Sequence, residues 1–131
     1  MKHNSIYRLA SLTCIVFALL VASSSASPAE TNDEILGKYY QAMMCGVHMG
    51  IFTVMAQNIN DKKMEAAFEA ATERYMRETV SLGAKLEKSE SVALGEFKKT
   101  GELYAKIPRY SEREIETIVT SCAPEILPLL K

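Results

Sequence analysis

The sequence has no tryptophan, and after its N-terminal segment it retains a single histidine, His48. It contains no C-x-x-C-H pattern, which excludes covalent attachment of a c-type haem. The H-E-x-x-H and E-x-x-H metal pairs and the nucleophile-elbow sequence are missing as well. The carboxylates lie on expected helix faces beside basic partners, so no isolated acid–base pair stands out. We therefore expect that the chain is not an enzyme.

No apolar run reaches the roughly 20 residues that a membrane-spanning helix needs. The longest one, LASLTCIVFALLVA at 9–22, follows Lys2 and Arg8 and precedes the small residues SSSASPA. A basic start, a short apolar stretch and a zone of small residues are typical of a secretory signal peptide. Ala26 is a suitable last residue before cleavage. We predict a signal peptide at 1–26 and a periplasmic or secreted protein, with an uncleaved anchor as the alternative.

The expected mature chain, 27–131, is long enough for a single domain. Removal of the signal changes the net charge from −1 to −3, because two basic residues and no acidic ones are lost. A chain without a basic surplus has no electrostatic footprint for nucleic acid or for an anionic membrane. We therefore expect one helical domain, no nucleic acid partner and no membrane association after cleavage.

Only two cysteines remain in the mature chain, Cys45 and Cys122. An even count in an exported protein indicates a disulfide, and two cysteines allow a single intramolecular pairing. The bond would close a loop of 77 residues, for which the chain-entropy model gives about 4–5 kcal/mol. Free or intermolecular cysteines are the alternative.

Apolar residues recur at three- and four-residue steps through most of the mature chain, which is the period of an amphipathic helix. Thr31 and Glu34 form a capping box that predicts a first helix reaching about Asn58. A second helix is expected to begin at Asn60 or Asp61, within the turn sequence NIND.

Two shorter helices follow in the pattern. Ser89 or Ser91 can cap the third, which must end before Pro108 because the residue preceding proline avoids the α region. Ser111 and Glu114 form a second capping box for the fourth. No strand pattern competes, so we predict an all-α fold, a small four-helix bundle-like domain with one disulfide.

The segment AMMCGVHMGIFTVMA at 42–56 carries no charge and is apolar around nearly the whole helix. A helix of this kind is central to its fold. Ala42, Gly46 and Gly50 are spaced by four residues. Because each glycine costs a helix about 1 kcal/mol relative to alanine, this stripe indicates close packing against a neighbouring helix.

The same segment holds the only candidate metal ligands. Met44, His48 and Met55 are soft ligands that suit Cu(I), but methionines at helical spacing are also typical of a core. Cys45 and His48 lack the further ligands that zinc requires. In size and architecture the chain resembles the b-type cytochrome bundles, which implies a haem held by His48 and a methionine. We expect no cofactor and keep a copper- or haem-binding bundle as an alternative.

Some apolar and aromatic residues lie where the core is not expected to reach. Tyrosine and arginine are the residues most enriched at binding hot spots. We therefore predict a partner surface that includes Tyr39, Tyr40, Arg109 and Tyr110. The apolar tail ILPLL at 126–130 is a further candidate. The alternatives are that these residues cover the ends of the bundle or form a homodimer contact.

Small exported helical proteins with one disulfide commonly act by covering another protein's surface. In architecture the chain is similar to the immunity proteins that neutralise type VI secretion effectors and to periplasmic acid-stress chaperones. The first resemblance implies a binding or inhibitor protein whose partner is another exported protein. The second implies a stress chaperone, although the cysteines here lie much further apart than in that group. We expect a protein-binding function, with the chaperone as an alternative.

Overall fold

The computed structural model of the protein describes residues 28–107 and 109–131. The chain divides into two units, Met1–Glu30 and Thr31–Lys131, and all the described helices belong to the second. The predicted signal peptide lies outside the described residues. No helix in the described ranges is long and apolar enough to cross a bilayer. The helices are α2 (Asn32–Asn58), α3 (Lys62–Lys85), α4 (Glu90–Tyr104), α5 (Glu112–Cys122) and the 3₁₀ helix η1 (Pro124–Leu130).

The helices begin where local hydrogen bonds satisfy their free N–H groups. Thr31 and Ser111 form the two predicted capping boxes, at the starts of α2 and α5. The side chain of Asp61 accepts the Met64 N–H at 3.0 Å at the start of α3. Ser89, rather than Ser91, caps α4 by accepting the Val92 N–H at 3.2 Å. The first N–H groups of a helix have no hydrogen-bond partner within the helix, and each cap supplies one in place of water.

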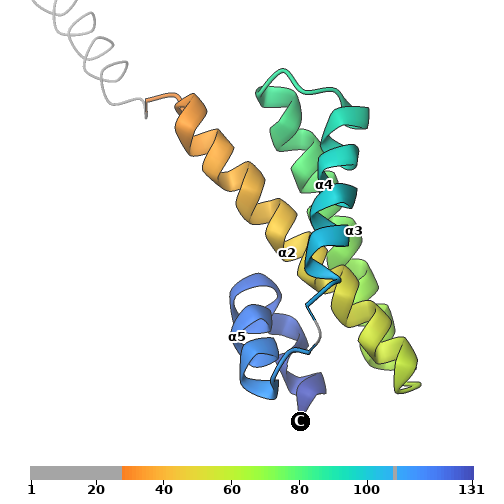
Figure 1. The fold of residues 1–131 in the computed structure, drawn as a ribbon. Coiled ribbons are helices and arrows are strands. Elements are labelled where there is room, and N and C mark those ends of the chain that lie inside the picture. The colour runs from red at the N-terminus through yellow and green to blue at the C-terminus, as the bar shows by residue number, and fades with distance from the viewer. Residues whose placement is uncertain (1–27, 108) are drawn as a thin grey trace, which may run out of the picture. The chain divides into compact units, whose positions relative to one another are not determined.

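Two left-handed residues turn the chain sharply after the long helices. Asn60 has φ 56° and follows α2, and Glu87 has φ 60° and follows α3. After α2, the N–H groups of residues 60 and 61 donate back to carbonyls in the last helical turn, as in a Schellman motif. Residues 87 and 88 do the same after α3. These turns reverse the chain, so that α2 and α3 form a long antiparallel hairpin (Figure 1).

The two halves of this hairpin are covered by different elements. Helix α4 packs on both α2 and α3 along one half, whereas α5 and η1 lie against the other half, where α5 contacts α2 and η1 contacts α3 (Figure 1). The prediction of an all-helical, bundle-like fold with one disulfide is confirmed. The described residues contain no strand. The fourth helix does not run the length of the hairpin, because 11 residues are too few to do so.

Helix α2 supplies side chains to two hydrophobic cores. The α4-side core consists of Ile35, Tyr39, Ala42, Met43, Val47, Leu82 and Ala93. The α5-side core consists of Cys45, Met49, Phe52, Ala56, Phe68, Ala71, Val119, Cys122, Ala123 and Ile126. Because the two cores lie on different sides of one helix, α2 needs apolar residues around most of its circumference.

The small residues of α2 differ in how closely they are packed. Ala42 is buried, and a Cβ atom added at Gly46 would lie 2.5 Å from Cε2 of Phe97 and 3.0 Å from Cβ of Tyr75. At Gly50 the nearest neighbour would be Cγ2 of Thr72 at 3.7 Å, an ordinary contact. Close approach therefore occurs at Gly46 and not at Gly50.

Candidate functional site

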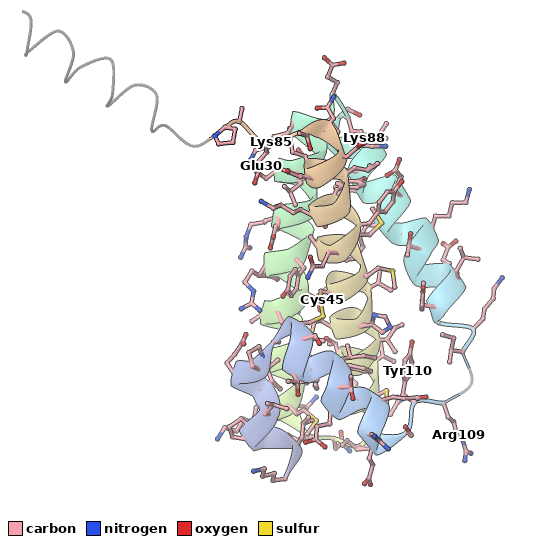
Figure 2. All side chains as sticks on the ribbon, turned by 90° about the vertical axis from the view of Figure 1, so that its left-hand side faces the viewer. Glu30, Cys45, Lys85, Lys88, Arg109 and Tyr110 are labelled. Atoms are coloured by element: carbon pink, nitrogen blue, oxygen red, sulfur yellow. A yellow bond between two sulfur atoms is a disulfide. The ribbon has the colours of Figure 1, made fainter. Side chains whose placement is uncertain are left out.

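The disulfide joins the middle of α2 to the last residue of α5. The Cα atoms of Cys45 and Cys122 lie 5.4 Å apart, and Cys45 marks the level at which α5 meets α2 in Figure 2. The Cys122 carbonyl, which α5 leaves unbonded, accepts hydrogen bonds from the Tyr75 hydroxyl and, at 3.4 Å, from Arg74. Arg74 also contacts Glu125 at 2.8 Å. The end of α5 is thus attached to the α2–α3 hairpin by a covalent bond and by polar contacts at the same place.

Tyr39 does not belong to a surface, so this part of the predicted partner site is wrong. Its side chain is 0 % exposed in the α4-side core, and its hydroxyl donates to Oε2 of Glu96 at 2.5 Å. Lys88 donates to the other carboxylate oxygen of Glu96 at 2.7 Å. The cluster therefore connects α2, α4 and the turn before α4. An aromatic ring on the first helix can belong to a core or to an interface, and its spacing in the sequence does not distinguish the two.

The Glu96 cluster makes stability depend on pH. Hydrogen bonds from Lys88 and Tyr39 hold the pKa of the Glu96 carboxyl below its usual value. Because this pKa is lower in the folded than in the unfolded chain, the contribution is present at neutral pH and is lost as pH falls through the folded value. We expect wild type to be more stable than Glu96→Gln at neutral pH, with the difference shrinking at about pH 3, below the ordinary glutamate pKa.

Urea unfolding at both pH values measures this difference, and Glu102→Gln is the control because Glu102 is an exposed residue of the same helix. A difference between wild type and Glu96→Gln that stays constant with pH would show that the carboxylate acts through packing and not through charge.

The other three residues of the predicted surface lie in different surroundings. Tyr40 is 51 % exposed, and its ring forms an edge-to-face pair with the Tyr39 ring, with the ring centroids 5.5 Å apart. Arg109 is exposed and extends away from the helices in Figure 2, whereas Tyr110 lies against them. The Tyr110 hydroxyl is buried and has no hydrogen-bond partner among the described residues. The structure therefore does not bring these residues together into one exposed patch.

His48 lies within a group of aromatic rings. Its ring centroid is 5.3 Å from that of Tyr104 and 5.7 Å from that of Tyr110. Its Nδ1 is 2.8 Å from the backbone oxygen of Met44, and a carbonyl oxygen only accepts, so Nδ1 carries the hydrogen. Met55 is 36 % exposed. Within the described residues no group of three or more histidine, cysteine or acidic side chains is placed to hold a metal ion. Copper binding by Met44, His48 and Met55 stays an untested alternative.

An apolar groove opens between the end of α2, the start of α3, α5 and η1. It comprises two neighbouring cavities, of about 480 Å³ and 160 Å³. Met64, Ile115 and Leu130 line both cavities, so the two lie next to each other. The larger one is also lined by Glu112, Glu116, Leu127 and Lys131, and the smaller by Phe52, Met55, Ala56, Ile59 and Phe68. We call this feature the α5 groove.

The rim of the α5 groove is apolar on one side and charged on the other. On the α2 side, Ile59 is 68 % and Met55 is 36 % exposed. On the α5 side, Glu112 and Glu116 are one helical turn apart, and neither carboxylate forms an ion pair with another described residue. Exposed apolar side chains beside an apolar hollow mark a binding surface more often than isolated ones do.

The sequence pattern indicated the groove only through the apolar tail at 126–130. Leu127 and Leu130 of that tail do line it. The opposite wall comes from α2 and α3, more than 50 residues earlier in the chain. That pairing depends on the disulfide and on the turn before η1, and periodicity within single helices carries no information about it.

Comparison of the chain with protein-family models, with curated proteins and with solved structures found no match. Its function must therefore be inferred from the geometry described above.

Proposed function

We propose that this chain is an exported protein-binding module, of the inhibitor or immunity kind, that acts by contact with another exported protein through the α5 groove. Export is proposed from the basic start, apolar run and small residues of 1–26. The observation that carries the binding proposal is the pair of adjacent cavities that share three apolar lining residues, with the exposed Met55 and Ile59 at the edge of the smaller one.

The dimensions and lining of the groove support this function. Exposed apolar grooves with polar groups at their rim are typical of surfaces that bind apolar segments of other proteins. In the α5 groove the polar groups are Glu112, Glu116 and Lys131, and the remaining lining is apolar. An apolar surface that stays exposed in the folded chain costs free energy in water, which a bound partner would recover.

The test compares capture by wild type and by Met55→Ser/Ile59→Ser. Purified chain 27–131 is used to capture partners from periplasmic extract, and a captured protein is identified, purified and titrated by calorimetry. We expect a one-to-one complex that the double variant weakens at least about tenfold, because burying one large apolar side chain contributes about 1.5–3 kcal/mol. Both substitutions are at exposed positions, so the fold is retained.

Val92→Ser/Leu103→Ser is the matched control. These residues are 48 % and 59 % exposed on α4, which packs on the other half of the hairpin. A partner that both double variants weaken equally, or that neither weakens, would refute the assignment of binding to the α5 groove. Arg109→Ala tests the segment between α4 and α5 separately, since Arg109 is the exposed residue of the predicted partner surface in that segment.

A further inference from the structure

The shape of the α5 groove restricts the kind of segment that it accepts. Its apolar lining includes Phe52 and Phe68 in the smaller cavity and Leu127 in the larger one, and three further apolar residues line both: Met64, Ile115 and Leu130. Two hollows that share a wall accept two successive apolar side chains of a rigid segment. In a helix, residues three and four apart provide this spacing on one face.

Two methionines contribute to the lining on the hairpin side. Met55 and Met64 lie at the end of α2 and the start of α3. Methionine side chains are unbranched and rearrange easily, so they adapt to apolar groups of different shape. A wall of this kind favours a partner segment with large apolar side chains over a small polar ligand.

The charges at the rim specify the polar edge of the partner. Glu112 and Glu116 border the larger cavity and have no basic partner among the described side chains, while Lys131 is the one cation in the lining. The lining thus carries one net negative charge, and its two carboxylates lie on a single face of α5. A cationic group on the partner would form ion pairs there, whereas an acidic group would be repelled.

We propose that the α5 groove binds an amphipathic helix with large apolar residues on one face and lysine or arginine along the edge that faces Glu112 and Glu116. The inference rests on the proposed protein-binding function and adds the chemistry of the partner segment. It follows from the two adjacent cavities with shared apolar residues, the two methionines in their lining and the two unpaired carboxylates on α5.

The probe is a fluorescein-labelled peptide of leucine and lysine with an amphipathic helical pattern, titrated with chain 27–131 and followed by anisotropy. A leucine–glutamate peptide of the same pattern and a leucine–lysine peptide of scrambled order are measured alongside. We expect only the patterned leucine–lysine peptide to bind, with an affinity that falls as salt is raised because the ion pairs are exposed.

The decisive variant is Glu112→Lys/Glu116→Lys, with Glu90→Lys/Glu102→Lys as the control of equal charge change. Glu112 and Glu90 are both the first residue of a serine-capped helix, so the effect on the helix start is matched. We expect the α5 variant to bind the peptide at least about tenfold more weakly, since like charges then face each other. The control variant should change the affinity less than about twofold, since surface charges beyond a Debye length are screened.

Any of the following results would overturn the inference. If the two charge variants weaken peptide binding equally, only the net charge of the protein matters. If the scrambled peptide binds as well as the patterned one, the partner need not be an amphipathic helix. If the acidic peptide binds equally well, the partner need not be basic. A chain whose sedimentation shows a dimer that Met55→Ser/Ile59→Ser dissociates would have a second copy in the groove. The identified partner could also fail to bind Met55→Ser/Ile59→Ser and still bind Glu112→Lys/Glu116→Lys. The proposed function would then hold, but the partner segment would not be a basic helix.

Discussion

Replacing Cys45 and Cys122 by serine should lower the free energy of unfolding by several kcal/mol, up to the roughly 4–5 kcal/mol that the chain-entropy model assigns to a 77-residue loop. Helix α5 has 11 residues and buries only Val119 and Cys122 fully. A helix this short is marginal on its own. Its position therefore depends on the disulfide, on the polar contacts at the Cys122 carbonyl and on a modest apolar contact.

The loss should be uneven along the chain. Hydrogen exchange should show that amides of α5 and η1 lose more protection than those in the α4-side core, because the hairpin and α4 retain their contacts. Urea unfolding of the serine variant and of reduced wild type distinguishes the effect of losing the disulfide from the effect of replacing the cysteine side chains. A stability loss below about 1 kcal/mol in both, no more than a typical point substitution produces, would show that the polar and apolar contacts alone hold α5.

The same experiment bears on the α5 groove. One wall of the groove consists of Ile115 and Leu130, which belong to the tethered elements, and the other consists of hairpin residues. When α5 and η1 detach, the walls separate. Partner binding should therefore decrease in the serine variant even at temperatures where the hairpin stays folded.

Alanine should stabilise the protein at Gly50 but not at Gly46. At Gly46, a Cβ atom would lie 2.5 Å and 2.7 Å from two ring carbons of Phe97 and 3.0 Å from Cβ of Tyr75. The ring can move, but Cβ of Tyr75 moves only with the backbone of α3. Overpacking typically costs about 1–3 kcal/mol, and for alanine this opposes a gain in helix propensity of about 1 kcal/mol.

At Gly50 the nearest atom would be in ordinary contact, so Gly50→Ala should raise the melting temperature by the gain in helix propensity, up to about 1 kcal/mol. We expect Gly46→Ala to be neutral to destabilising and Gly46→Leu to be clearly destabilising in thermal and urea unfolding. Phe97→Leu should reduce the cost of Gly46→Ala, and a double-mutant cycle measures this coupling. A rise in melting temperature for both alanine variants would refute close packing at Gly46.

Local signals in the sequence determined where the helices begin and end. Thr31, Asp61 and Ser111 cap helices with their own side chains, and the polar NIND turn ends α2 at Asn58 as expected. Such interactions join residues within five positions of one another, so their physical cause is visible in a short stretch of sequence. The disulfide was equally determined, because two cysteines allow a single intramolecular pairing.

Tertiary structure decided which apolar side chains are buried and which are exposed. Tyr39 and Tyr40 are neighbours in the sequence, yet one is fully buried and the other is half exposed. The difference arises because α4 presents Ala93 and Glu96 to one side of α2 only. Likewise, Gly46 and Gly50 have the same spacing pattern, but only Gly46 faces the Phe97 ring.

The α5 groove also depends on tertiary structure. Its walls come from residues 52–68 and 112–131, and the pattern of each segment is that of an ordinary amphipathic element. Helical periodicity indicates which face of an element is apolar, but the contact partner of that face depends on chain reversals and on the disulfide far from it in sequence. The sequence by itself therefore determined the helices and their covalent link, and packing between distant segments decided where an apolar surface stays open to a partner.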